Sequence, residues 1–169
     1  MNGYSQQLLL SFGGNELSTE ECFRESLIML SERFGNPLHV SSIYETQAWG
    51  FDTATNPFLN QLVVFNTNDK VESILEFTQS IEKIKGRKSK SSNGSYANRP
   101  IDIDILCYGD LEITTNNLIV PHKFMHERNF ILIPLQEILP NFIHPTLKKT
   151  LKELLLLTQD DLQVKPYKK

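Results

Sequence analysis

Residues 99–106 decide how this chain folds, and they read Arg99-Pro100-Ile101-Asp102-Ile103-Asp104-Ile105-Leu106. Alternating aliphatic and acidic residues are typical of a β-strand, in which successive side chains point to opposite faces. Asp102 and Asp104 are therefore expected on one face, roughly 6.5–7 Å apart, with the isoleucines facing a core. Carboxylates at that spacing can hold one or two hard cations, and Arg99 lies just upstream. The stretch indicates magnesium-dependent phosphoryl transfer, or alternatively a solvent-facing strand edge with two ordinary acids.

The composition indicates an ordinary globular protein. Its 169 residues are 40% hydrophobic and 22% charged, which predicts a single domain over residues 1–169 with a sizeable core. The net charge of −3 argues against a general nucleic-acid binder. The apolar runs are too short to span a bilayer and the N-terminus lacks a secretory pattern, so no membrane partner is expected. With Cys22 and Cys107 taken as free thiols, we expect a cytoplasmic protein, a monomer, that acts on small molecules.

Apolar periodicity and turn residues divide the chain into short elements. We expect strands at 7–12, 38–45, 58–66 and 101–108, helices from the capping residues 18–21 to Gly35 and at 71–85, 127–139 and 147–157, a hairpin arm at 111–120, and a frayed polar tail at 163–169. Pro134 should interrupt or bend the third helix. The order β-α-β-β-α-β favours an α+β fold, a ferredoxin-like sandwich with an antiparallel sheet, helices on one face, a small hairpin arm and a C-terminal helix.

Four blocks of residues carry a resemblance to a known family. They are Gly13-Gly14-Asn15; Tyr44-x-Thr46 with Phe58-Leu59-Asn60; Arg99-x-x-Asp102-Ile-Asp104-Ile-Leu; and Val120-Pro121-His122 followed by Met125, Arg128, Phe130 and Pro134-Leu135. From about residue 8 to about residue 151 the chain resembles the 6-hydroxymethyl-7,8-dihydropterin pyrophosphokinases. The resemblance implies an enzyme of folate biosynthesis that transfers the pyrophosphoryl group of ATP to the hydroxymethyl oxygen of the pterin and releases AMP.

The resemblance also implies roles for residues at the nucleotide end of the site. Asp102 and Asp104 would bind two Mg²⁺ ions that bridge the triphosphate of the co-substrate ATP. The residues implied to be catalytic are Arg87, Arg99, Asp102 and Asp104. The implied nucleotide contacts are Gln79, Glu82, Arg87, Arg99, Ile105, His122 and Arg128. Taken alone, His122 is better explained as a surface loop histidine and Arg128 as a solvated helix residue, and the block around them favours the functional roles.

At the other end of the site the resemblance implies a pterin pocket. Its implied residues are Thr46, Gln47, Trp49, Phe58, Asn60, Tyr96 and Phe130. A flat bicyclic ring gains burial and stacking between aromatic side chains, and amide and hydroxyl groups distinguish its edge. Phe130 matches one family ring, and Tyr96 lies near the place of the other. Core packing remains the alternative for Phe58 and Phe130, and Trp49 either lines the pocket or covers it.

The chain departs from the family pattern at several basic positions. Arginines are expected where Ser89 or Lys90, Ser95 and Asn117 stand. The partial replacements are Lys88, Lys90 and Lys123, which are point charges without the bidentate fork of arginine. Two other functions stay open: a sugar-nucleotide transferase with a D-x-D motif, and a ferredoxin-like regulatory module without chemistry. The first predicts a longer, doubly wound chain, and the second does not require the acidic and basic residues together.

Overall fold

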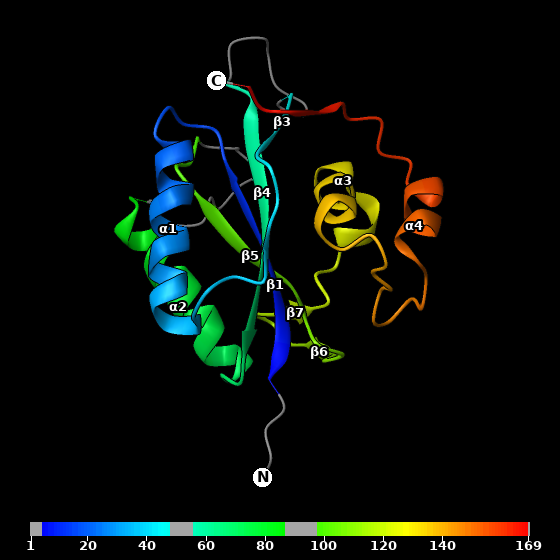
Figure 1. The fold of residues 1–169 in the computed structure, drawn as a ribbon, viewed down its shortest axis with the longest axis horizontal. Helices are drawn as coiled ribbons and strands as arrows, with labels where there is room; N and C mark the ends of the chain where they lie inside the picture. The colour runs from blue at the N-terminus through cyan, green and yellow to red at the C-terminus, as the bar shows by residue number, and fades with distance from the viewer. Residues whose placement is uncertain (1–4, 48–55, 87–97, 169) are drawn as a thin grey trace.

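The computed structural model describes residues 5–47, 56–86 and 98–168 of the chain. Within these ranges an antiparallel sheet forms the centre of the molecule, and helices cover both of its faces (Figure 1). No helix in the described ranges is long and apolar enough to cross a membrane.

The sheet consists of six described strands with every pairing antiparallel. Its order is β5 (Asp102–Tyr108), β1 (Gln6–Gly14), β4 (Phe58–Thr67), β3 (Tyr44–Thr46) and β8 (Val164–Pro166), with β2 (His39–Val40) pairing β4. A separate hairpin joins β6 (Ile113–Thr114) to β7 (Ile119–Val120). The predicted α+β class, antiparallel sheet and hairpin arm are confirmed. β1 lies inside the sheet, between β5 and β4, and its alternating side chains reach both layers that cover the sheet.

Helices lie on both faces of the sheet (Figure 1). On one face lie α1 (Thr19–Phe34) and α2 (Val71–Ile84), as the sequence predicts. On the other face lie α3 (Asn129–Ile138) and α4 (Leu151–Leu157). The expectation of helices on one face therefore holds for α1 and α2 and requires a correction for α3. This helix is apolar enough to bury against the second face, which β-strand alternation also makes apolar.

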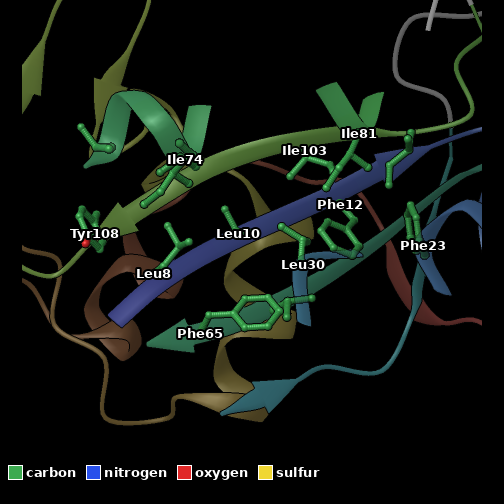
Figure 2. Close-up of a cluster of buried hydrophobic side chains, with 14 of the residues drawn as sticks. Leu8, Leu10, Phe12, Phe23, Leu30, Phe65, Ile74, Ile81, Ile103 and Tyr108 are labelled. Carbon is green, nitrogen blue, oxygen red and sulfur yellow. The ribbon is translucent and has the colours of Figure 1, made fainter. Parts of the chain in front are cut away.

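The alternation of side chains along β1 builds two cores, one on each face. Leu8, Leu10 and Phe12 point toward α1 and α2 and pack with residues such as Phe23 and Ile103 (Figure 2). On the opposite face, a second cluster joins the sheet to α3 and α4. Its members include Leu9, Leu62, Val64, Leu106, Ile131, Leu132 and Leu135. The two clusters hold β1, β4 and β5 between layers, which gives the strand ends a rigid setting.

Several element boundaries differ from the sequence prediction. The single strand predicted at 38–45 is two short strands, β2 and β3. The helix predicted at 127–139 begins as the 3-10 turn η1 (Met125–Glu127), and α3 then runs without interruption through Pro134. The last helix begins at Leu151 because Thr150 and Glu153 form a capping box.

The prediction of a frayed tail at 163–169 is wrong for the described residues. Residues 164–166 form β8, which pairs with β3 in antiparallel register. The backbone N–H of Tyr167 also donates to the carbonyl of Ile43, 2.8 Å away. The tail is ordered because β3 offers an unpaired edge, which composition alone does not reveal.

Candidate active site

A cavity of about 930 Å³ opens on the face of the sheet that α3 and α4 cover. The strands supply Ser11, Gly13, Thr46, Phe58, Asn60, Asp102 and Asp104 to its lining; Gln47 follows β3, and Arg99 precedes β5. The helical layer supplies Phe124, His126, Glu127, Arg128, Phe130, Leu154 and Leu157. The remaining lining residues are Leu147, Lys149 and the segment 158–162. A cavity of this volume lies within the range of small-molecule sites.

The floor of the cavity is a row of residues across three strands. Gly13 of β1 pairs with Asn60 of β4 on one side and with Asp102 of β5 on the other. In the next row Ser11 pairs with Asp104. Directly paired residues point to the same face of a sheet, so the carboxylates and the Asn60 amide face the same space. Gly13 lies between them without a side chain and leaves that space open.

The two carboxylates alternate with buried isoleucines, as the sequence predicts. Ile103 and Ile105 are each only 4% exposed and pack on the α1–α2 side, whereas Asp102 is partly buried and Asp104 is exposed. The guanidinium of Arg99 forms an ion pair with Asp102. Two neighbouring carboxylates repel each other, and a cation beside them offsets that repulsion. The predicted strand geometry is confirmed.

Arg99 is itself held in place by the end of β1. Its backbone N–H donates to the Asn15 side-chain oxygen at 2.9 Å, and the Asn15 N–H donates to the Arg99 carbonyl at 3.1 Å. Asn15 is buried, with 3% of its surface exposed. A further contact joins the Asn15 amide nitrogen to the Asn98 side-chain oxygen at 2.8 Å. The block 13–15, which sequence reasoning recorded without assigning a role, therefore fixes the backbone on which Arg99 stands.

Polar and aromatic groups meet at the other end of the cavity. The Asn60 amide nitrogen donates to the Thr46 hydroxyl at 3.2 Å, and both residues are buried. Phe58 and Phe130 are half-buried and contribute ring surface. The guanidinium carbon of Arg128 lies 5.4 Å from the ring centre of Phe124 and 5.5 Å from that of Phe130. This corner combines hydrogen-bonding edges with flat apolar faces, the chemistry that suits a planar heterocycle.

Several predicted site residues do not line this cavity. Glu82, which is 5% exposed, accepts a 2.7 Å hydrogen bond from the backbone N–H of Ile103. The Ile105 side chain lies in the core between the sheet and the α1–α2 layer, and Gln79 is half-buried on α2. Trp49, Arg87 and Tyr96 lie outside the described residues, as do Lys88 and Lys90.

His122 also lies outside the cavity lining, just after β7. Its backbone N–H donates to the Leu106 carbonyl at 2.8 Å, and its Nδ1 accepts from the backbone N–H of Phe124 at 3.3 Å. Burial lowers the pKa of His122, and the charge of Arg128 lowers this pKa further. The imidazole is therefore neutral near pH 7 in the free protein, with Nδ1 as an acceptor.

Sequence reasoning missed the C-terminal wall of the cavity. Leu154, Leu157 and the segment 158–162 line it, although they follow the predicted blocks by many residues. No local pattern marks them, because their place depends on how α4 docks against α3. Ser11 was missed as well, and Gly13 was noted only within the block 13–15, yet their position on β1 opposite the aspartates follows from strand pairing.

The donor set suits a magnesium ion that is shared with a substrate. Among the described residues, no group of three or more His, Cys, Asp and Glu side chains could hold a metal. Mg²⁺ is commonly held by one or two carboxylates together with water and substrate phosphates, rather than by a cage of protein ligands. Asp102 and Asp104, side by side at the cavity floor, supply that pair of oxygen ligands.

The chain is similar in sequence to known proteins. A family model described as 7,8-dihydro-6-hydroxymethylpterin-pyrophosphokinase (HPPK) matches residues 9–140. A Porphyromonas gingivalis protein named 2-amino-4-hydroxy-6-hydroxymethyldihydropteridine pyrophosphokinase is 39% identical over 137 residues, which are 80% of this chain and 92% of that protein. The Aquifex aeolicus protein of the same name is 44% identical over 114 residues, or 68% of this chain and 69% of that one.

Solved structures show the same fold. The crystal structure of Plasmodium falciparum HPPK-DHPS wild type with pteroate matches with a TM-score of 0.67 at 17% identity. The match covers 91% of this chain and 42% of that longer chain. The sequence relatives and the family match, which extends over most of the cavity-forming elements, show that the chain belongs to the 7,8-dihydro-6-hydroxymethylpterin-pyrophosphokinase family.

Proposed function

We propose that the cavity above β1, β4 and β5 is the active site of a pyrophosphokinase of folate biosynthesis. In this site the pyrophosphoryl group of ATP is transferred to the hydroxymethyl group of 6-hydroxymethyl-7,8-dihydropterin, and AMP is released. The observation that carries the proposal is that one cavity holds the paired carboxylates Asp102 and Asp104 together with the Asn60–Thr46 amide and hydroxyl pair and the Phe130 ring. One end suits phosphates and the other suits a flat heterocycle.

The pterin occupies the polar and aromatic end in this proposal. Asn60 and Thr46 read its amide edge, because a buried amide and hydroxyl reject rings that lack the matching donors and acceptors. Phe130 and Phe58 stack on its faces, and Gln47 lies at the rim. Trp49 and Tyr96 remain proposed pterin contacts from the family resemblance.

The triphosphate of ATP occupies the charged end. Asp102 and Asp104 would hold two Mg²⁺ ions, with Arg99 and Arg128 as guanidinium partners for phosphate oxygens. Magnesium held there would supply positive charge to offset the negative charge that develops on the transferred group. Further nucleotide contacts are proposed from the resemblance for Gln79, Glu82, Arg87, Ile105 and His122.

The chain's contribution to the reaction is placement and electrostatics. Asn60 and Phe130 hold the ring so that its hydroxymethyl oxygen faces the β-phosphate, which converts an encounter of two substrates into one oriented step. Arg99 and Arg128 stabilise negative charge that grows on the transferred group. Direct transfer between the two substrates needs no covalent intermediate on the protein.

We also propose that the enzyme works in the cytoplasm as a monomer on small-molecule substrates, without nucleic-acid or membrane partners. Its two cysteines, Cys22 and Cys107, are free and buried, which suits a reducing compartment. Burial raises the pKa of the Cys107 thiol to about 12, so this thiol is inert. Light scattering on the purified chain tests the monomer, and a dimer mass contradicts it.

The test of the proposed function is the formation of AMP from MgATP with and without 6-hydroxymethyl-7,8-dihydropterin. We expect AMP only with the pterin, and a loss of about 100-fold or more in kcat for Asp102→Ala and Asp104→Ala. Asp110→Ala is the matched control, since Asp110 is an exposed carboxylate just beyond β5 and outside the cavity lining. Full activity of a folded Asp102 or Asp104 variant would contradict the assignment.

A further inference from the structure

The segment 158–162, which follows α4, forms one wall of the cavity and is joined to the start of α3. It lies beyond residues 9–140, the part of the chain that the family model matches. Its hydrogen bonds involve both side chains and backbone, and they reach Glu127 at the end of η1 and Asn129 at the start of α3. The place where the segment touches α3 is therefore specific rather than a general packing contact.

Asp160 makes the central contacts. Its Oδ2 accepts a 2.7 Å hydrogen bond from the backbone N–H of Asn129, and its carbonyl oxygen accepts one of 2.6 Å from the Asn129 side chain. The hydroxyl of Thr158 donates to the Glu127 carbonyl at 3.0 Å. The Asp160 carboxylate is oriented by its own segment, because Oδ1 accepts from the Leu162 N–H at 3.0 Å.

These contacts supply a cap that α3 does not make for itself. The residue before the helix, Arg128, makes no side-chain capping hydrogen bond, and its backbone is extended. The first N–H groups of a helix need acceptors, and a carboxylate there also interacts favourably with the helix dipole. Among the described residues, Asp160 provides that acceptor from 31 positions farther along the chain.

The capped residue lies between two residues of the proposed substrate site. Arg128 and Phe130 flank Asn129 and both line the cavity. Their side chains also touch, with the Arg128 guanidinium carbon 5.5 Å from the Phe130 ring centre. A shift of the Asn129 backbone therefore moves a proposed phosphate contact and a proposed pterin contact together.

We propose that Asp160 is a positioning residue of the active site, which holds the start of α3 so that Arg128 and Phe130 face the substrates. The inference rests on the proposed function of those two residues. The body of α3 is anchored separately by Ile131, Leu132 and Leu135, which are at most 2% exposed. Removing the Asp160 side chain should therefore loosen the first turn and leave the helix docked.

The experiment measures pterin binding by calorimetry in the presence of a non-hydrolysable MgATP analogue. We expect Asp160→Ala to weaken pterin binding about five- to tenfold, and Asp160→Asn, which keeps an acceptor oxygen, to stay within about twofold of the parent. Glu153→Ala is the matched control. It removes the acceptor of the α4 capping box, which also lies at a helix start but outside the cavity lining, and should leave pterin affinity unchanged.

A double-mutant cycle separates this inference from the proposed function. If Asp160 acts through Phe130, adding Asp160→Ala to Phe130→Ala should weaken binding by less than about twofold more. Parental affinity in Asp160→Ala alongside weakened binding in Phe130→Ala overturns the positioning role and leaves the proposed pterin contact in place. Parental affinity in Phe130→Ala overturns that contact, and the inference with it. If Asp160→Ala does not fold, Thr158→Val tests the same contact between segment 158–162 and the start of α3. A pterin affinity of Thr158→Val equal to that of the parent also overturns the inference.

Discussion

At the scale of single residues, Gly14 is the glycine, among those that the structure describes, where an added Cβ comes closest to backbone. A Cβ added there lies 2.5 Å from the carbonyl oxygen of Pro100 and 2.8 Å from two side-chain atoms of Thr19. Pro100 lies between Arg99 and the start of β5, so a shift of its backbone would also displace Arg99 at the charged end of the site. We expect Gly14→Ala to cost about 2 kcal/mol, or about 4–8 °C in Tm.

The neighbouring glycine provides the control for this prediction. A Cβ at Gly13 is 3.8 Å from the Asn60 side-chain oxygen, an ordinary contact, so Gly13→Ala should keep the parental Tm. Its methyl group would nevertheless stand on the cavity floor between Asn60 and Asp102, and pterin affinity should fall. Thermal unfolding of both variants checks the contrast, and an unchanged Tm for Gly14→Ala would contradict the predicted clash.

Lys123 and Arg128 differ in how firmly their charges are held. The Arg128 guanidinium is near both the Phe124 and Phe130 rings, whereas the Lys123 ammonium lies 4.9 Å from the Phe124 ring centre alone. We expect Lys123→Ala to raise the KM for ATP a few-fold, mainly at low salt, with kcat nearly unchanged. Arg128→Ala should instead lower kcat. Measurements of KM and kcat for both variants at low and high salt test this contrast. An effect of Lys123→Ala on the KM for ATP that does not change with salt would contradict the role of Lys123 as a screened point charge.

At the scale of elements, β5 is an edge strand whose outer side depends on α2. Glu82 accepts from the Ile103 N–H, between the two aspartates in sequence. Glu82→Ala leaves that N–H without this acceptor, and we expect a loss of about 1–3 kcal/mol, whereas Glu82→Gln retains an acceptor and most of the stability. Urea unfolding separates the two variants. Equal stability of both variants would mean that the hydrogen bond contributes little to β5.

The same strand shows what the sequence could predict. The alternation at residues 101–105 determines which side chains are buried, because strand geometry has a period of two. The start of α3 could not be read in this way. The expected helix from residue 127 gives way to a 3-10 turn and an extended Arg128, and the cap arrives from Asp160 through tertiary contact. Local periodicity carries no information about a cap that lies 31 residues away.

The connection between α3 and α4 depends on a neutral histidine. His144 is 4% exposed, and its Nδ1 accepts from the N–H groups of Thr146 and Leu147 at 3.3 and 3.2 Å. Burial lowers its pKa, the charge of His126 lowers this pKa further, and Glu112 opposes the shift.

The pH dependence of stability follows from that shift. Because the folded-state pKa of His144 is below its ordinary value of about 6.5, the unfolded chain binds the proton first. The stabilising effect of the neutral His144 imidazole is complete at pH values above about 6.5. It is lost as the pH falls from there toward the lowered folded-state pKa. We expect the parent to lose more Tm between pH 7 and pH 5 than His144→Asn, whose side-chain oxygen can accept at a similar place. Parallel Tm profiles would contradict this role.

At the scale of the whole molecule, the site exists because distant parts of the chain meet over one sheet face. β1, β4 and β5 supply the floor, and the start of α3 supplies one wall. The chain after α4 forms another wall before it returns to the sheet as β8 (Figure 1). The motifs predicted the floor and the start of α3, since their residues stand in compact blocks. They could not predict the C-terminal wall, because its place depends on tertiary contacts: Asp160 and Thr158 form hydrogen bonds at the start of α3, and the chain beyond them pairs with β3.

Deleting residues 164–169 tests whether the pairing of β8 with β3 helps to shape the proposed pterin pocket. β8 pairs Val164 with Thr46, so its loss frees the edge of the strand that carries the proposed pterin contact. We expect a lower Tm and a several-fold higher KM for the pterin, with kcat less affected, because Thr46 orients Asn60 through its hydroxyl. Deleting only residues 168–169 keeps every β8 pairing and is the control. If the longer deletion lowers Tm and leaves the pterin KM at the parental value, the C-terminal strand stabilises the fold without shaping the pterin pocket.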